Sequence, residues 1–397
     1  MLKNNFWKVG VIISIALIFS SCQKDPGNNL KKQDETSPSP GDISSKKSST
    51  PTVKIFSTGL NNPRGLKFGP DGYLYVAEGG LGGSHSSVGM CEQVPFPVGP
   101  YLGSPTGARI SRISHTGVRT TFADNFPSSQ ANELVGGDVE GVADIAFIDH
   151  TMYALLAGAG CSHGVPSMPN GIVKVKSDGS WGLIANLSSW LMAHPVMHPE
   201  EDDFEPDGTF YSMISVHNNF YILEPNHGDF IKVTKSGNIS RVVDISASQG
   251  HIVSTVVAND DENFFIGNLN TFPIVDGSSK ILKVTPDGKL KVWATGFTTI
   301  LGLITDDDDN MYVLENTTGN PFPTPGTGKI IRINHSGTKK TIVSGLNLPT
   351  GITLGPDGKL YVSAWGFGPI ARGGGQVLQI DINNHGHDEE EEGHHED

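Results

Sequence analysis

GLNNPRGLKFGPDGYLYVAE, at residues 59–78, returns near the end of the chain as GLNLPTGITLGPDGKLYVSA, at residues 345–364. Weaker copies of the same phrase occupy residues 141–156, 207–223, 253–268 and 302–315. A phrase that recurs in units of roughly 40–60 residues is typical of a repeat architecture. We therefore expect the chain to be built from several similar units.

Each copy predicts short strands joined by tight turns. In the first, the apolar run 65–68 precedes Gly-Pro-Asp-Gly at 69–72, where proline presets φ for a turn and glycine supplies a positive φ. Residues 73–77 are rich in aromatic and β-branched side chains, as strands are. Residues 108–113 alternate like a half-buried third strand, and a fourth follows at 118–122.

The third and fourth strands recur as well. Similar apolar runs at 172–175, 230–233, 281–284 and 330–333 each precede a turn that contains glycine. Six four-stranded units predict an all-β fold, a six-bladed β-propeller, which hides its sheet edges by radial repetition.

The two ends of the repeat region predict how the ring closes. The last unit has three recognisable strands and ends at 376–381, whereas residues 53–57 have no partner of their own. We expect 53–57 to supply the fourth strand of the last blade. The alternative is an open solenoid, which would leave sheet edges exposed.

The composition agrees with an all-β ring and argues against one class of partner. The 397 residues include 49 Gly and 25 Pro and carry a formal net charge of −14. The sequence holds no basic patch, so we expect no nucleic-acid partner. The His- and acid-rich residues 385–397 could chelate divalent metals loosely, or they could be a solvated, disordered terminus.

The N-terminus predicts location. The apolar core 9–19 is too short for a comfortable transmembrane span, so residues 1–21 are interpreted as a signal peptide. Ser-Ser-Cys at 20–22 resembles a bacterial lipobox, which implies a lipid on Cys22; an ordinary signal peptide is the alternative. Residues 22–51 lack apolar side chains to bury and should be a disordered tether to a propeller at 52–383, with a disordered tail at 384–397. We expect an exported lipoprotein, anchored to a membrane and facing the periplasm or the cell surface.

Two further cysteines predict a disulfide. In an exported chain the compartment is oxidising. Cys91 lies in the loop between the second and third strands of the first unit, and Cys161 lies in the same loop of the second unit. In an up-and-down blade these loops share one face, so we expect Cys91 and Cys161 to pair rather than remain free thiols.

The same strand parity predicts the working face. The face that carries the cysteines also carries the long insertions, whereas the opposite face carries the short Asp-Gly and Ser-Gly turns. Loops that grow on one face of a rigid scaffold often carry function. Candidate binding residues lie at the entry of the first inner strand or where second strands end: Arg64, Glu78, Glu224, Asn226, His227, Asn268, Asn270, Glu315, Asn316 and Trp365.

Residues 59–80, followed by Cys91 and by Pro-Thr-Gly at 105–107, resemble the ScyD/ScyE family of exported bacterial propellers. The resemblance covers the whole repeat region and implies the fold, but it carries no agreed catalytic residues. The repeats are more distantly similar to NHL-repeat proteins and to the senescence-marker/gluconolactonase hydrolases.

The hydrolase resemblance implies a divalent cation, usually calcium, in the central channel. Such an ion takes oxygen ligands and polarises a carbonyl for attack by water. Glu140 and Gly141 resemble the first Glu-Gly motif of those enzymes, and Asp144 is close by. The later inner strands lack obvious Asn or Asp ligands, so Glu140 and Asp144 could instead be satisfied polar groups at a strand start.

Other clusters predict less. The acidic run 306–309 stands where the other units have a turn, and Asx residues in turns need no ion. Zinc could be held by His194, His198 and His217, but the first two lie in a proline-broken loop without a zinc-protease helix. The sequence contains no Gly-x-Ser-x-Gly elbow and no phosphate-binding Gly-x-x-x-x-Gly-Lys motif.

The sequence thus favours a lipid-anchored propeller that binds a ligand, glycan or protein through its long-loop face. The first alternative is a divalent-metal-dependent lactonase or ester hydrolase, which would need a bound ion, calcium or another divalent cation. The second is an accessory role in scytonemin-like secondary-metabolite biosynthesis, which would need a deep apolar, aromatic pocket.

Overall fold

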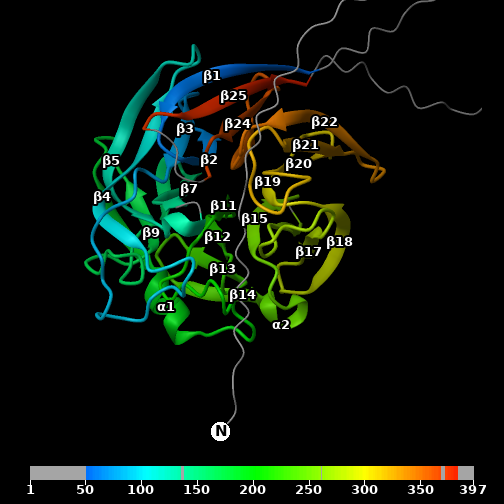
Figure 1. The fold of residues 1–397 in the computed structure, drawn as a ribbon. Coiled ribbons are helices and arrows are strands. Elements are labelled where there is room, and N and C mark those ends of the chain that lie inside the picture. Colours follow the sequence, from blue (N-terminus) through cyan, green and yellow to red (C-terminus); the bar gives the residue numbers. More distant parts are fainter. Residues whose placement is uncertain (1–50, 136–137, 261, 368–371, 383–397) are drawn as a thin grey trace, which may run out of the picture. The chain divides into compact units, whose positions relative to one another are not determined.

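Each repeat copy becomes one antiparallel sheet in the computed structural model, which describes residues 51–135, 138–260, 262–367 and 372–382 (Figure 1). Six sheets surround a centre, so the predicted six-bladed β-propeller is confirmed. The predicted signal peptide, Cys22, most of the tether and the tail lie outside the described residues. Within the described ranges, no helix has both the length and the apolar character needed to cross a bilayer.

The first three blades include the loops with the longest insertions. The first blade consists of β2 (Pro63–Phe68), β3 (Leu74–Glu78), β4 (Leu102–Ile113) and β5 (Arg119–Gln130), with the short β6 (Val139–Glu140) at its edge. The second consists of β7 (Val142–Ile148), β8 (Thr151–Leu156), β9 (Gly171–Val175) and β10 (Trp181–Asn186). The third consists of β11 (Ser212–Val216), β12 (Asn219–Glu224), β13 (Asp229–Thr234) and β14 (Ile239–Asp244). Short helices lie in their connections: η1 (Glu133–Val135), α1 (Leu187–Ala193) and α2 (Ser246–Gln249).

The other three blades complete the ring. Their strands are β15 (Ser254–Asn259), β16 (Phe264–Asn268), β17 (Ser279–Val284) and β18 (Leu290–Phe297); then β19 (Ile300–Thr305), β20 (Met311–Glu315), β21 (Gly328–Ile333) and β22 (Lys339–Leu346); and last β23 (Gly351–Leu354), β24 (Leu360–Ala364) and β25 (Gly375–Asp381), joined by β1 (Thr52–Leu60).

The ring closes as the sequence predicts. Strand β1 pairs antiparallel with β25, from Thr52 opposite Asp381 to Leu60 opposite Gly375, and becomes the outer strand of the last blade (Figure 1). It is longer than the predicted 53–57 and reaches the first repeat phrase. The prediction of a closed ring is therefore confirmed, and the open solenoid is excluded.

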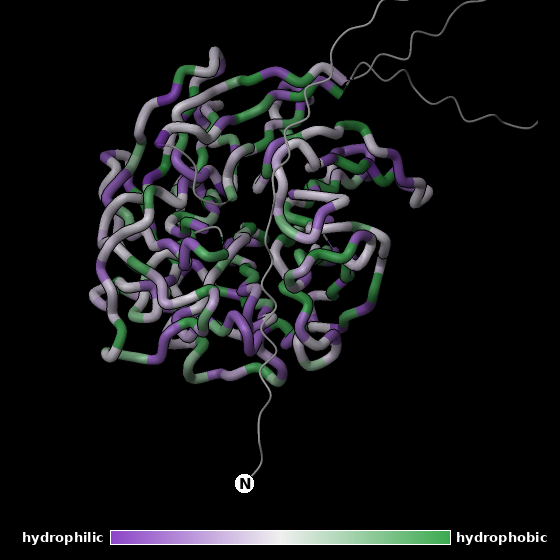
Figure 2. The backbone as a smooth tube through the Cα atoms, in the orientation of Figure 1, coloured by the Kyte–Doolittle hydropathy of each residue, from purple (hydrophilic) through white to green (hydrophobic). Residues whose placement is uncertain are grey.

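The hydrophobic core lies between adjacent blades. One buried cluster joins Tyr75 and Ala77 of the first blade to Val142 and Ile145 of the second. Hydrophobic and hydrophilic stretches alternate along the chain, as half-buried strands require (Figure 2). The innermost strands β2, β7, β11, β15, β19 and β23 all border a central cavity of only about 40 Å³, so side chains fill most of the channel.

A tyrosine–aspartate hydrogen bond explains why the repeated phrase keeps its turn and its second strand. The Tyr75 hydroxyl donates to Asp71 at 2.9 Å, Tyr312 donates to Asp306 at 2.9 Å, and Tyr361 donates to Asp357 at 3.1 Å. In each case the turn carboxylate holds the strand that leaves the turn. Asp306 also accepts bonds from the amides of Asp308 and Asn310, so the acidic run 306–309 satisfies a turn.

We expect these tyrosines to make the fold sensitive to alkali. Burial raises the pKa of Tyr75 and of Tyr361 from 10.0 to about 12, with nearby Asp71 and Asp357 adding to the effect. Because the folded-state pKa is the higher one, the protonated rings stabilise the fold fully below pH 10, and this contribution disappears as the pH rises towards 12. Urea unfolding of the wild type should show a decline in unfolding free energy over this range.

The matched variants are Tyr75→Phe and Tyr361→Phe. Each should lose about 1 kcal/mol at neutral pH, the usual value of one hydrogen bond, and should show a shallower decline above pH 10. Tyr73→Phe, which changes a ring placed over Arg112, serves as the control. An alkaline decline as steep in Tyr75→Phe and Tyr361→Phe as in the wild type would contradict the assignment.

Candidate functional site

Three titratable side chains from separate segments meet in the interior. Glu140 lies on β6, His163 in the loop between β8 and β9, and Glu205 in the connection between α1 and β11. The Nε2 atom of His163 is 3.0 Å from Oε2 of Glu140 and 2.8 Å from Oε2 of Glu205. The three ligand-type atoms all lie within 4.8 Å of one another, so the group could hold a metal ion. We call these three residues the Glu–His–Glu group.

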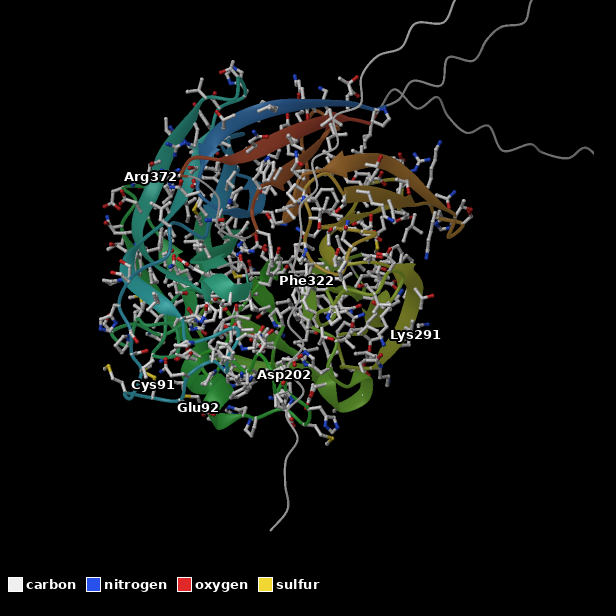
Figure 3. The ribbon with its side chains drawn as sticks, viewed as in Figure 1. Cys91, Glu92, Asp202, Lys291, Phe322 and Arg372 are labelled. Atoms are coloured by element: carbon white, nitrogen blue, oxygen red, sulfur yellow. A yellow bond between two sulfur atoms is a disulfide. The ribbon has the colours of Figure 1, made fainter. Side chains whose placement is uncertain are left out.

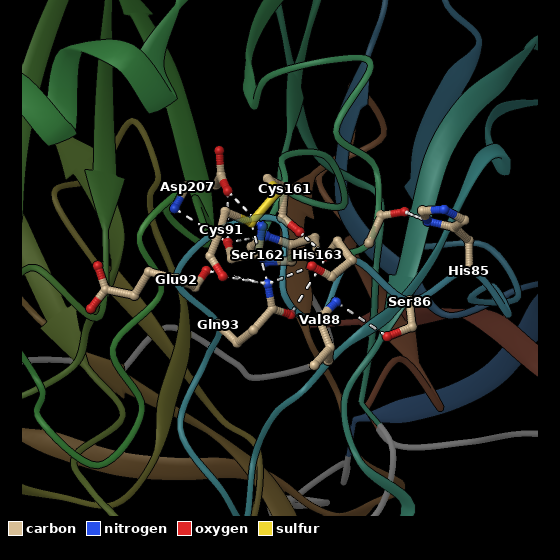
Figure 4. The surroundings of a disulfide bond; sticks show 12 residues. His85, Ser86, Val88, Cys91, Glu92, Gln93, Cys161, Ser162, His163 and Asp207 are labelled. Atoms are coloured by element: carbon tan, nitrogen blue, oxygen red, sulfur yellow. Dashed lines mark hydrogen bonds between the residues drawn. A yellow bond between two sulfur atoms is a disulfide. The ribbon is translucent and has the colours of Figure 1, made fainter.

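The loop that carries His163 is fixed by a disulfide. Cys91 and Cys161 lie at bonding distance, with an S–S separation of 2.06 Å and Cα atoms 6.3 Å apart (Figure 4). Gly160 turns the chain just before Cys161 with φ +103, and a Cβ atom there would lie 2.2 Å from Cγ of Asp207. Only glycine fits that turn, and the disulfide then holds the next two residues, Ser162 and His163, against the neighbouring segment.

Hydrogen bonds around Ser162 fix the proton on His163. The Ser162 hydroxyl donates to Oδ2 of Asp207 at 2.8 Å, so its oxygen accepts from Nδ1 of His163 at 3.3 Å (Figure 4). Nδ1 therefore carries a hydrogen. Nε2 is left to face the two carboxylates, either as a donor in the imidazolium or as a lone pair.

Glu205 retains its proton unusually well, and so does His163. Burial raises the pKa of Glu205, and the nearby charge of Glu140 raises it further, while His163 opposes both. Burial by itself would lower the pKa of His163, but its hydrogen bonds to Glu140 and Glu205 outweigh that and raise it. Glu205 and His163 therefore both hold their protons more tightly than the same groups do in water.

A further carboxyl group, that of Asp203, lies beside the Glu–His–Glu group. Oδ1 of Asp203 is buried and has no hydrogen-bond partner. Burial raises the pKa of Asp203 well above its ordinary value, and Glu205, Glu140 and Glu200 add to the shift. Three carboxylates therefore share this interior region with His163.

Arg64, predicted as a binding residue, lies on β2, and its guanidinium already has partners. Its guanidinium donates to Oδ1 of Asp138 at 2.8 Å and to the carbonyl of Val139 at 2.7 Å. The guanidinium carbon lies 5.9 Å from the ring centre of Tyr211, whose hydroxyl donates to the carbonyl of Thr350 at 3.0 Å. Arg64 is 6% exposed, so its guanidinium holds neighbouring segments together and is not open to a ligand.

The structure does not bring Glu140 and Asp144 together as metal ligands. Asp144 borders the central cavity, where its two oxygens accept the amides of Ile145 and Met213, both at 2.9 Å. Lys67 also lines that cavity. Because calcium needs six to eight oxygen ligands, the described lining of the channel does not fit the calcium site that the hydrolase resemblance implies.

The predicted carboxylates at the ends of second strands hold loops rather than forming an open mouth. Glu78, Glu224 and Glu315 are each 0% exposed. They accept backbone amides: Asn61 at 2.6 Å on Glu78, Thr209 at 2.9 Å on Glu224, and Thr298 at 3.0 Å on Glu315. Buried amides need such partners. The prediction that these three side chains line a binding mouth is therefore corrected.

The remaining candidates on the long-loop face are either buried structural groups, partly exposed side chains, or neighbours of Glu205. Asn268 donates to the carbonyl of Ile252 and Asn316 to that of Pro349, both at 2.9 Å, and both side chains are buried. Asn270 and Trp365 are partly exposed. Asn226 and His227 lie beside Glu205: the amide of Asn226 is 3.3 Å from its Oε1, and Nε2 of His227 is 3.0 Å from its carbonyl.

An apolar pocket of about 260 Å³ opens next to His227. The ring of His227 stacks on Phe204 at 5.0 Å, and its Nε2 donates to the Glu205 carbonyl. Figure 3 labels Glu92, which is one of the residues that line this pocket. Its lining is Glu92, Leu191, Met192, Pro195, Val196, Pro199, Phe204, Pro206 and His227.

The three histidines considered for zinc do not form a site in the described part of the chain. His194 contacts the carbonyl of Trp190 through Nδ1 at 2.8 Å, and His217 lies at the turn between β11 and β12. Neither they nor His198 belong to the Glu–His–Glu group, the one such group among the described residues. Sequence reasoning selected Glu140 but missed His163 and Glu205; the available signal was the position of His163 two residues after Cys161.

Comparisons with known proteins support the fold. A scan against protein-family models and a sequence search of curated proteins gave no match. Among solved structures, a putative oxidoreductase (glucose dehydrogenase) from Thermus thermophilus is 15% identical, with a TM-score of 0.52 over 83% of this chain and 100% of that chain. A structural-genomics protein of unknown function from Bacteroides thetaiotaomicron is 12% identical, with a TM-score of 0.53 over 83% and 76%.

A gluconolactonase from Xanthomonas campestris is also similar in fold, at 10% identity and a TM-score of 0.49 over 83% of this chain and 89% of that chain. At such identities the likeness concerns the fold alone. The ScyD/ScyE resemblance therefore stays a prediction.

Proposed function

We propose that the chain is a binding protein whose long-loop surface holds a ligand, glycan or protein partner. We define the long-loop surface as the connections 79–101, 187–211, 269–278 and 316–327, which lie between strands. The observation that carries the proposal is the exposure of large apolar side chains in these loops. They are Leu81, Val88, Met90, Phe96, Met192, Met197, Phe272, Val275 and Phe322.

Such exposure costs free energy in water unless a partner covers it. Phe96 is 72% exposed and Phe322 is 60% exposed. Phe322 stacks with Phe272, with 6.4 Å between the ring centres, and the amide of Ile274 donates to the carbonyl of Pro321 at 2.8 Å. The loops 269–278 and 316–327 therefore form one exposed apolar patch. The apolar pocket beside His227 adds a concave site to the same surface.

Photo-crosslinking from the full-length protein in intact cells tests this function. A photoreactive residue in place of Phe96 or Phe322 should yield a discrete adduct. The same residue in place of Val292, 46% exposed on the outer strand β18, is the control and should yield none. Equal labelling from all three positions, or no adduct from Phe96 and Phe322, would overturn the proposal.

The Glu–His–Glu group favours a second candidate, a divalent-metal-dependent lactonase or ester hydrolase. Glu140, His163 and Glu205 would hold the ion, and the ion would polarise a carbonyl for attack by water. Glu140 is the part of the group that solvent reaches, since its side chain is 11% exposed. A panel of five- and six-membered lactones, offered with zinc, manganese or calcium, should show turnover that Glu140→Gln abolishes and Glu133→Gln retains.

The location is part of the proposal. An apolar binding surface on an exported, lipid-anchored propeller would stand outside the cytoplasm and close to a membrane. Cell fractionation of the wild type and of Cys22→Ala, with metabolic labelling by a fatty-acid analogue, tests this directly. Unchanged membrane association and labelling in Cys22→Ala would exclude the anchor.

A further inference from the structure

We infer that Glu140, His163 and Glu205 form a specific site for one divalent transition-metal ion of the zinc or manganese class. The ligand atoms are Oε2 of Glu140, Nε2 of His163 and Oε2 of Glu205. The inference is independent of the binding surface proposed above. It deepens the hydrolase candidate, whose ion it identifies by class.

The first argument is that every other polar atom of the three ligands already has a partner. Oε1 of Glu140 accepts from the Thr209 hydroxyl, and Nδ1 of His163 donates to the Ser162 hydroxyl. Oε1 of Glu205 accepts from the Tyr101 hydroxyl at 3.1 Å and from the amide of Asn226 at 3.3 Å. The three remaining atoms are therefore left facing one another.

Ligands in known metal sites show the same arrangement, in which one polar atom faces the ion and the other is held by a neighbour. Metal-binding histidines donate their second ring nitrogen to a neighbouring acceptor, and metal-binding carboxylates are held through their second oxygen. Here Asp207 fixes Ser162, and Ser162 fixes the ring of His163. The edge of the Tyr101 ring packs against the His163 ring at 4.9 Å, which limits its rotation.

The second argument is the burial of several carboxyl groups around one imidazole. His163 is 0% exposed and Glu205 is 1% exposed. Oδ1 of Asp203 is buried without a hydrogen-bond partner, and Oε2 of Glu140 contacts Nε2 of His163 at 3.0 Å. A carboxylate removed from water is costly unless a charge or donor compensates it, and a divalent cation among these oxygens would compensate several at once.

The ligand types decide the class of ion. Calcium and magnesium prefer sites made of oxygen alone, whereas an imidazole nitrogen suits zinc and iron, and carboxylates suit manganese. One imidazole with two carboxylates therefore fits the zinc and manganese class. Three protein ligands also leave at least one coordination position for water or substrate. Oxygen-only calcium binding is therefore not expected at this group.

The test uses the full-length chain with the tail histidines at 385, 387, 394 and 395 changed to Gln in every sample, so that the tail cannot bind the metal. After chelation and dialysis, zinc, manganese and calcium are titrated separately, and bound metal is counted by plasma mass spectrometry. We expect one equivalent of zinc or manganese, with a rise in melting temperature, and no stoichiometric calcium.

The variants separate ligands from neighbours. His163→Gln and Glu205→Gln should weaken zinc binding by more than about 100-fold, and Ser162→Ala by about 10-fold, since it alters only the support of His163. His194→Gln and Glu133→Gln are controls and should bind like the parent. Visible absorption of the cobalt-loaded parent should differ from that of cobalt-loaded His163→Gln.

Absence of stoichiometric zinc or manganese in the parent, or unchanged affinity in His163→Gln, would overturn the site. If His163→Gln does not fold, unchanged affinity in Ser162→Ala would overturn it instead. Metal binding without any lactone turnover would remove the hydrolase candidate and leave the metal site standing. The cross-linking experiment is unaffected by either result.

Discussion

A chain from which Thr52–Leu60 has been deleted is expected to lose its stable monomeric fold. These residues form β1, which supplies the outer strand of the last blade. Deletion would expose the hydrogen-bonding edge of β25, and unpaired edges promote association between chains. It would also remove Leu60, which is 0% exposed and packs in a cluster with Leu66, Leu74 and Tyr361.

The expected loss of unfolding free energy can be judged from the side chains that the deletion removes. Loss of a buried leucine to alanine typically costs about 2–5 kcal/mol, and a domain is stable by only about 5–15 kcal/mol in total. Phe56 adds an edge contact with Tyr361 at 5.1 Å. Removing both side chains together with a nine-residue ladder should therefore unfold the ring or drive it to aggregate.

Urea unfolding and light scattering after size-exclusion chromatography measure this. Leu60→Ala should lower the unfolding free energy by about 2–5 kcal/mol, whereas Ile55→Thr, at a side chain 58% exposed, should change it by less than about 0.5 kcal/mol. A monomer with an unchanged unfolding midpoint after deletion would show that closure by β1 does not stabilise the ring.

The second large effect is expected from Cys91→Ser combined with Cys161→Ser. The two cysteines are 70 residues apart. In the chain-entropy treatment, closing a loop of this length in the unfolded state stabilises the fold by about 4 kcal/mol. The loss should appear as a lower midpoint in urea, with a somewhat steeper slope, because the unfolded chain exposes more surface once the cross-link is gone.

The same pair should matter locally for the Glu–His–Glu group. Gln93 donates to the carbonyl and to the sulfur of Cys91, at 3.1 and 3.2 Å, so the disulfide anchors both loops at one point (Figure 4). Without the disulfide, the loop that carries His163 is less constrained, and the affinity of the Glu–His–Glu group for zinc should fall as well. A double variant as stable as the wild type would mean that the bond contributes no net stability.

The fold followed from the sequence because each blade repeats its own local signals. Asp71, Asp306 and Asp357 all act in the same turn, and the tyrosine that follows each of them donates to that carboxylate. Turn chemistry and strand periodicity therefore agreed at these three copies, which is the condition under which local patterns predict architecture.

The candidate site did not follow from the sequence, because no repeat encodes it. Glu140, His163 and Glu205 come from non-equivalent segments, and no spacing rule joins them. Conversely, Glu78, Glu224 and Glu315 stand at equivalent positions and resembled a shared binding mouth, yet they serve buried backbone amides. The polar residues that recur at equivalent positions of the blades are therefore structural, whereas the residues of the Glu–His–Glu group have no equivalents in the other blades.

The pairing of β1 with β25 also decides when the ring can form during synthesis. Residue 52 emerges early and must wait for residue 381 before the last blade is complete. While it waits, an equivalent β1 from a second chain can enter the same position and make the same hydrogen bonds. A high concentration of unfinished chains would therefore favour exchange of β1 between chains over closure within one chain.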